Sequence, residues 1–206
     1  MATLTTLTAS LRNDLQDTAS STWTDALLER AITKAVGDFG LAWPVVASVD
    51  EAGVTDQRRY DLSATTGLLW VEAVEHEKDQ DPPEFHPFRE ESRGVIYLLG
   101  DIIPATGDTF AVWYARTYTV DASGSTIPAE YEEFVLTGAF GHAFLMRASD
   151  TVGRINPSTW APRQARDLAA HRLDEFSSRL KELRNRRAAP WWRPTWGTRP
   201  RDWGTV

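Results

Sequence analysis

The chain has 206 residues, of which 42% are hydrophobic and 25% charged, as in an ordinary soluble protein long enough to bury a core. It has no cysteine, which excludes disulfides and thiolate metal sites. Its net charge of −7 is divided unevenly: residues 179–206 carry +6, which leaves −13 for residues 1–178. So acidic a body argues against general nucleic-acid binding by residues 1–178.

The N-terminal residues lack the basic region and the cleavage signal of a secretory leader. The longest apolar run, residues 134–146, is too short to cross a bilayer. We therefore expect a protein that is made and used inside a cell, or inside a particle assembled there.

Two helices are predicted near the N-terminus, over residues 5–18 and 23–41. Three leucines spaced four residues apart give the first helix a narrow apolar stripe. The second helix is expected to start with a capping box at residues 22–25, in which Thr22 is the N-cap. Together the two helices form a helical hairpin.

Residues 45–120 have β character, with strand-like runs at 59–62, 68–75, 95–99 and 109–120 separated by turn residues. We predict one antiparallel sheet of four or five strands in meander order. The two faces of the last run are Phe110, Val112 and Tyr114 on one side and Ala111, Trp113 and Ala115 on the other.

The segment 75–86 between two of these runs contains His76, His86 and several carboxylates. Its spacing matches no zinc site and no calcium loop. We interpret it as a solvated acidic hairpin loop, and its contact with a partner or a cation stays open.

Two further helices are predicted over residues 128–149 and 161–187. The third helix is apolar on most sides and is expected to be the central helix of the core. Gly138 and Gly141 permit close approach of another helix, and His142 is predicted to be a core or interface histidine. The apolar strip of the fourth helix includes Leu168, Phe176 and Leu183.

Residues 188–206 follow as a segment rich in tryptophan, arginine and proline, which we call the C-terminal arm. Its prolines and glycines exclude a continuing helix, and its apolar residues follow neither the helical nor the strand period. Four indoles are too apolar to be left in water, so the arm is expected to bind something else. The alternative is that it wraps over its own domain.

The elements predict an α+β fold: a four-helix core of two N-terminal and two C-terminal helices, an inserted antiparallel β-sheet and an extended C-terminal arm. The domain is expected to span residues 1–187 and the arm residues 188–206. No P-loop, dinucleotide-binding, nucleophile-elbow or zinc-protease motif occurs. We therefore expect no enzyme, no cofactor and no metal.

Four short motifs, in this order, resemble those of the head-to-tail adaptor (head-completion) proteins of tailed phages. They are WTDALL at 23–28, YDL at 60–62, VWY at 112–114 and IPAEY at 127–131. A leucine-striped first helix precedes them and a long fourth helix follows, so the resemblance covers residues 1–187.

The resemblance implies a ring, usually twelve-fold, that assembles beneath the portal protein and continues the DNA channel toward the tail. It places the protein in the neck of a virion assembled in the host cytoplasm. Its implied partners are the portal, neighbouring adaptor subunits and a downstream neck or tail protein, while genome DNA passes through without sequence-specific binding. The residues expected to bind the portal are Trp191, Trp192, Arg193, Trp196, Arg199, Arg201 and Trp203.

Two alternatives remain. The chain is another neck or tail-completion protein on the same scaffold, or it is a nucleic-acid-binding module that acts through the arm. In the second case the indoles would stack on bases.

Overall fold

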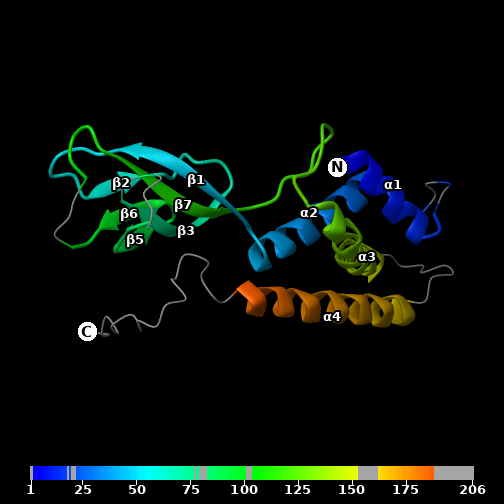
Figure 1. Ribbon diagram of the computed structural model, residues 1–206. Helices are drawn as coiled ribbons and strands as arrows, with labels where there is room; N and C mark the ends of the chain where they lie inside the picture. The colour runs from blue at the N-terminus through cyan, green and yellow to red at the C-terminus, as the bar shows by residue number, and fades with distance from the viewer. Residues whose placement is uncertain are drawn as a thin grey trace.

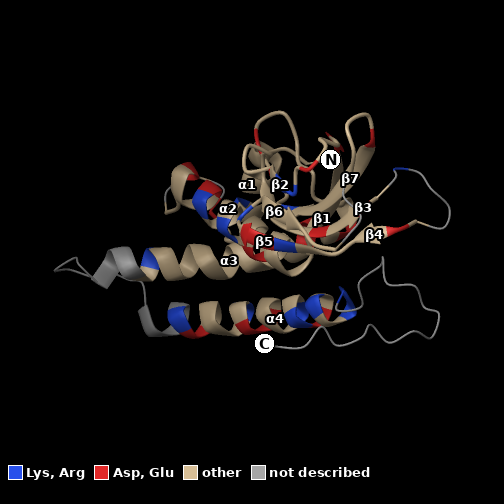
Figure 2. Ribbon diagram, turned by 90° about the vertical axis from the view of Figure 1, so that its left-hand side faces the viewer, with Lys and Arg blue, Asp and Glu red and all other residues tan. Residues whose placement is uncertain are grey.

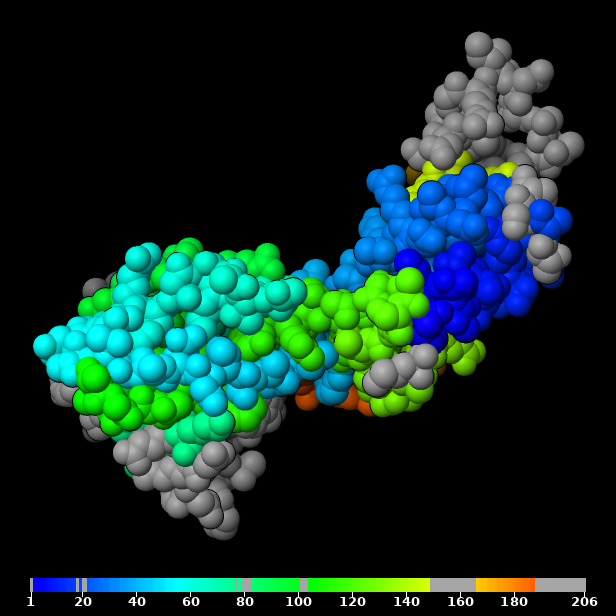
Figure 3. Space-filling view, turned by 90° about the horizontal axis from the view of Figure 1, so that it is seen from above, coloured from blue at the N-terminus to red at the C-terminus, as the bar shows by residue number. Residues whose placement is uncertain are grey.

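The computed structural model describes residues 2–17, 19, 22–76, 78, 83–100, 104–152 and 162–187. These residues form one helical lobe and one lobe built of strands, joined end to end by a narrow waist (Figure 1, Figure 3). The α+β class predicted from the sequence, with helices at both ends and an antiparallel β insertion, is confirmed.

The helical lobe contains, within the described residues, the helices α1 (Leu4–Asp14), α2 (Asp25–Ala42), α3 (Ala129–Val152) and α4 (Pro162–Arg187). Its core includes Phe39 of α2, which is fully buried and stacks on Tyr118 with the ring centroids 5.0 Å apart. Val135 and Ala139 of α3 are fully buried in the same core. The third helix lies between α2 and α4, as predicted (Figure 1).

The first helix is shorter than predicted and ends at Asp14 instead of residue 18. Thr3 caps its N-terminus by accepting a hydrogen bond from the amide of Thr6. Gln16 has a φ of 54°, in the left-handed region that ends a helix. The stripe that was predicted from the leucine spacing is buried at Leu7 and Leu11.

The second helix begins two residues later than predicted, and the expected N-cap at Thr22 is wrong. Thr24 is the N-cap, and its Oγ1 accepts from the amide of Leu27 over 3.4 Å. The amide of Thr22 instead donates to the Asp17 carboxylate, which holds Thr22 in the preceding loop. Because the buried Asp17 carboxylate binds the amide of Thr22, Thr24 takes the N-cap position that the sequence pattern had assigned to Thr22.

Two glycines allow α3 and α4 to pack closely, as predicted. A Cβ added at Gly138 would lie 2.7 Å from the ring of Phe176, and one at Gly141 would lie 2.6 Å from Cγ of Leu173. Phe176 is almost fully buried, whereas Leu168 is 42% exposed. The assignment of Leu168 to the buried strip of α4 is therefore wrong, since the helix turns that position outward.

The sheet lobe contains, in the described part of the chain, the strands β1 (Val45–Ala52), β2 (Arg59–Asp61), β3 (Leu68–Glu75), β4 (Phe85–His86), β5 (Phe88–Ser92), β6 (Val95–Leu98) and β7 (Thr109–Arg116). They form two sheets, in the orders β1-β7-β3-β4 and β2-β6-β5, and all their pairs are antiparallel. The prediction of one meander is wrong because the first strand pairs with the last. Two layers bury one face of each sheet, which a single open meander does not.

The core of the sheet lobe lies between the two sheets. Val74, Ile96, Leu98 and Val112 are fully buried there. The alternation predicted for the last strand is confirmed: Phe110, Val112 and Tyr114 belong to this core, which turns Ala111, Trp113 and Ala115 to the opposite face.

The two lobes are connected by chain segments that lie side by side. β1 follows α2 after Trp43 and Pro44, and it pairs with β7 from Val45↔Arg116 to Ala52↔Thr109. No described helix combines the length and the apolar character needed to span a membrane.

Candidate functional site

The residues predicted to bind a partner lie outside the described residues. They are Trp191, Trp192, Arg193, Trp196, Arg199, Arg201 and Trp203. The helix that precedes the C-terminal arm is described up to Arg187. The surroundings of Arg187 therefore define the place from which the arm starts.

Arg187 is held by the sheet lobe. Its Nη2 donates to Oε1 of Glu72 over 2.5 Å, and its guanidinium carbon lies 5.8 Å from the centroid of the Trp70 ring. The indole N–H of Trp70 donates to the same Glu72 oxygen over 2.9 Å. The Arg187 and Glu72 side chains are only 20% and 12% exposed, so this pair fixes the end of α4 against β3.

The last turn of α4 is basic, with Arg184, Arg186 and Arg187. Positive charge is favourable at that end because the helix dipole is negative there. Figure 2 shows these cations gathered at the C-terminal end of α4, while acidic and basic residues alternate along the rest of the helix.

One face of the larger sheet points away from the sandwich core, and we call it the outer sheet face. It consists of Val46, Ser48, Asp50, Trp70, Ala73, Glu75, Ala111, Trp113 and Ala115. The strand register places Trp113 between Ser48 of β1 and Ala73 of β3, and it places Trp70 next to Ala115. Two half-buried indoles therefore stand on neighbouring strands with small side chains between them.

Carboxylates accompany both indoles of the outer sheet face. The indole N–H of Trp113 donates to Oε2 of Glu75 over 2.8 Å, as that of Trp70 does to Glu72. Glu75 is only 7% exposed. On β1, Asp50 forms an ion pair of 2.7 Å with Lys78. The face therefore combines aromatic surface with carboxylates, a chemistry that fits a basic and aromatic segment.

A pair of histidines, His76 and His86, lies at the edge of the larger sheet where β4 pairs with the end of β3. Nε2 of His86 lies 2.7 Å from Nδ1 of His76, and the rings meet edge to face. Both rings and Glu84 line a pocket of about 150 Å³. Burial and the neighbouring His76 lower the pKa of His86, while Glu84 acts in the opposite direction.

A hydrogen bond between two imidazoles needs at least one neutral ring, so this pair is stable when His86 is uncharged. Among the described residues, no group of three or more metal-ligating side chains is close enough to hold a metal ion. The prediction of a solvated acidic loop at 75–86 is wrong at both ends, because Glu75 is a buried residue of β3 and Phe85–His86 form β4, in which His86 is buried. Residues 77 and 79–82 of this segment lie outside the described residues.

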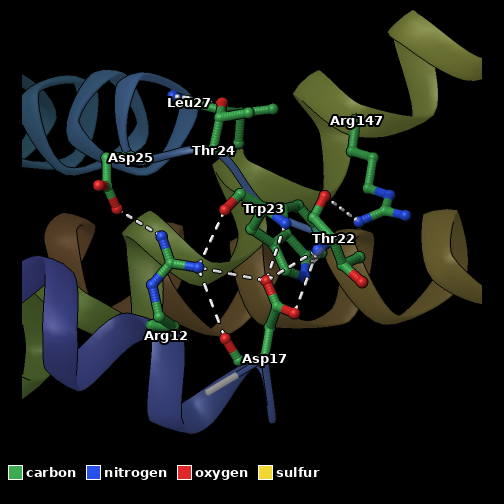
Figure 4. A network of polar contacts seen from close by, with 8 residues as sticks. All are labelled: Arg12, Asp17, Thr22, Trp23, Thr24, Asp25, Leu27 and Arg147. Carbon is green, nitrogen blue, oxygen red and sulfur yellow. Dashed lines mark hydrogen bonds and ion pairs between the residues drawn. The ribbon is translucent and has the colours of Figure 1, made fainter. Parts of the chain in front are cut away.

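A buried charge network ties α1 to the start of α2 (Figure 4). Nη1 of Arg12 donates to Oδ2 of Asp17 over 3.2 Å and to the carbonyl of Trp23 over 2.9 Å, and its Nη2 contacts Asp25. Asp17 also accepts from the amides of Thr22 and Trp23. The network belongs to the scaffold, and sequence reasoning missed it because its members come from different segments.

Arg147 of α3 completes this corner. It donates to the carbonyl of Thr22 over 2.7 Å, and its guanidinium carbon lies 4.7 Å from the centroid of the Trp23 ring. Trp23 is 3% exposed and also meets Phe144 edge to face. The first residue of the WTDALL motif is therefore a core residue of the helical lobe.

The prediction that His142 is a core histidine is confirmed. It is 7% exposed, and its Nε2 lies 2.9 Å from Oδ2 of Asp38 on α2. Burial lowers the pKa of His142, and the contact with Asp38 opposes this shift.

The structure thus brings together four groups that the sequence analysis did not connect: Trp70, Glu72, Trp113 and Arg187. Among them, only Trp113 had been assigned to a strand face from the sequence, and no local signal pointed to the other three. Comparison of the chain with protein-family models and with curated proteins found no match to either.

Proposed function

We propose that this chain is a structural head-to-tail adaptor of a tailed phage. Copies assemble as a ring beneath the portal, bind the portal through the C-terminal arm and continue the DNA channel toward the tail. The ordered motifs of the sequence support this proposal, as does a four-helix lobe that carries an inserted β lobe. The protein acts by assembly alone.

The observation that carries the proposal is the attachment of Arg187 to Glu72 and Trp70. The arm starts from a point that both lobes hold in place. A ring of such subunits presents all its arms at the same radius and height, which suits attachment to a second ring.

The energetics of the arm favour binding through many copies. Four indoles bury roughly 150–250 Å² each, which corresponds to about 15–25 kcal/mol at about 25 cal/mol per Å². Ordering the backbone costs about 1–2 kcal/mol per residue and offsets most or all of that gain. A single arm therefore binds weakly, whereas a ring of arms binds firmly through multivalency.

The acidic charge of residues 1–178 supports the channel role. A surface with a net charge of −13 repels phosphates, so DNA slides past it without adhering. The basic arm is suited to bind a partner away from the path of the DNA.

The test is co-purification of the chain with its portal, using the full chain and a variant that ends at Arg187. We expect the shortened variant to lose portal binding while its circular dichroism and melting change little. A full-length variant with Thr195→Ala and Thr198→Ala is the matched control and should bind normally.

Normal portal binding by the shortened variant would refute the proposal. Binding to a tail protein but not to the portal would favour another neck component. Retention on single-stranded DNA with a steep dependence on salt would favour the nucleic-acid alternative.

A further inference from the structure

We propose that the outer sheet face is the docking surface for the C-terminal arm of the same chain, residues 188–206. The larger sheet then holds the arm in the free protomer. This inference does not rest on the phage function, because the arguments for it are the position, reach and chemistry of the two surfaces.

The first argument is position. Arg187 lies over Trp70 and is bonded to Glu72, both on β3. The arm therefore starts at the margin of the outer sheet face, with its first tryptophans four and five residues further along the chain.

The second argument is reach. A chain extends by at most about 3.3–3.6 Å per residue, so Trp191 reaches roughly 13 Å from Arg187. Adjacent strands are about 4.8 Å apart, so this distance covers the step from β3 to β7 and on to β1. The order β1-β7-β3 places Trp113 within that span.

The third argument is chemistry. The outer sheet face offers the half-buried rings of Trp70 and Trp113, against which flat indoles pack. Asp50 is the exposed carboxylate of this face and is paired with Lys78, Glu75 is 7% exposed, and Glu72 lies at the margin, where it is paired with Arg187. The arm carries three arginines against one aspartate, so the charges of the two surfaces are opposite.

Prolines favour binding across the face over pairing along a strand edge. Pro190, Pro194 and Pro200 lack the amide hydrogen that a new strand would donate, and they hold the backbone extended. A proline-rich segment that carries indoles and arginines suits a flat surface of aromatic rings and carboxylates.

The occupant is the chain's own arm because of tethering. A segment joined directly to Arg187 is present at an effective concentration in the millimolar range, far above that of arms on other molecules. If the adaptor function also holds, the portal competes with the outer sheet face for the arm.

The experiment uses disulfide trapping in the full-length chain, which has no cysteine of its own. Ser48→Cys, exposed on β1 beside Trp113, is combined in turn with Thr195→Cys, Thr198→Cys and Thr205→Cys in the arm. The control is Ser92→Cys, exposed on β5 in the other sheet, with the same three arm cysteines. Non-reducing electrophoresis separates monomers with an internal disulfide from linked dimers.

We expect at least one arm cysteine to form an internal disulfide with Cys at position 48 about tenfold faster than with Cys at position 92. Replacing Trp191 and Trp192 by alanine should reduce that rate several-fold, since the indoles provide the contact. These substitutions lie outside the described fold, so they test the docking and not the core.

Equal rates for the two sets of pairs would overturn the proposal, as would linked dimers in place of internal disulfides. Both results are independent of portal binding. A chain that binds the portal without any preference for position 48 keeps its proposed function and loses this inference. A chain that favours position 48 but does not bind the portal keeps this inference and loses its proposed function.

Discussion

At the scale of single residues, the helical lobe depends on a buried charge. Arg12 is 9% exposed and Asp17 is 6% exposed, and each satisfies the other together with backbone groups of the loop between α1 and α2. Such a pair adds little when complete, but the loss of one member leaves an unbalanced charge in the interior.

Arg12→Ala should therefore lower the free energy of unfolding by about 3–5 kcal/mol. Chemical denaturation followed by circular dichroism measures this. Arg30→Ala on the exposed side of α2 is the matched control and should stay within about 0.5 kcal/mol of the parent. A cost for Arg12→Ala no larger than the control's would mean that water enters the network freely.

Buried histidines make the stability depend on pH. Burial lowers the pKa of His142 in the folded state from its ordinary 6.5, so the unfolded chain takes up a proton first as the pH falls. The free energy of unfolding should hence decrease as the pH drops below about 6.5, and His86 acts in the same direction. His142→Gln should flatten the curve of unfolding free energy between about pH 5 and 7.

At the scale of elements, the contact of α3 with α4 is set by the absence of side chains. Gly138 and Gly141 sit where a Cβ would meet Phe176 and Leu173. Glycine normally weakens a helix by about 1 kcal/mol relative to alanine. Here the close approach of the two helices compensates for that weakness.

Gly138→Ala should destabilise the chain by about 1–3 kcal/mol, because the ring of Phe176 is fully enclosed and cannot move aside without strain. Gly37→Ala in α2 has no atom within 4 Å of the new Cβ and should stabilise by about 0.5–1 kcal/mol. Thermal melting of both variants checks the pair. Shifts of the same sign would show that helix propensity, and not packing, governs both sites.

The helices were predictable from the sequence because their signals are local. The apolar spacing located all four, and only their ends differed, as with Thr24 replacing Thr22 at the N-cap of α2. Strands β1, β4 and β5 were missed, because β4 has only two residues and the residues of β1 and β5 do not alternate cleanly. Val45–Ala52 becomes a strand by pairing with Thr109–Arg116, and no local pattern encodes a partner so distant in the chain.

At the scale of the whole molecule, three links join the lobes within the described residues: the α2–β1 connection, the segment after β7 and the Arg187 attachment. The first two lie close together at the waist. The third holds the sheet lobe from α4, through the contacts of Arg187 with Glu72 and Trp70, and is expected to limit rotation about the waist.

Arg187→Ala should consequently broaden the range of distances between the lobes. Spin labels on Ser92→Cys and Arg30→Cys, in a chain without other thiols, report that range by dipolar spectroscopy. Arg184→Ala, one turn earlier on the exposed side of α4, should leave it unchanged. Identical distributions in both variants would show that the waist alone fixes the lobes.

The candidate site was predictable only in part. The composition of residues 188–206 singled out the arm, and its role stays a prediction. The outer sheet face could not be foreseen, because Trp70 and Trp113 become neighbours only through the pairing of β3 with β7. The residues of the outer sheet face come together through the pairing of distant strands, and their spacing in the sequence does not reveal this.

The adjacency of Val45 and Arg116 has a consequence for engineering. These residues are Cα partners, and a two-residue turn spans such a pair. Residues 46–115 can thus be deleted, or replaced by a domain whose two ends lie next to each other, and the helical lobe is expected to keep its fold.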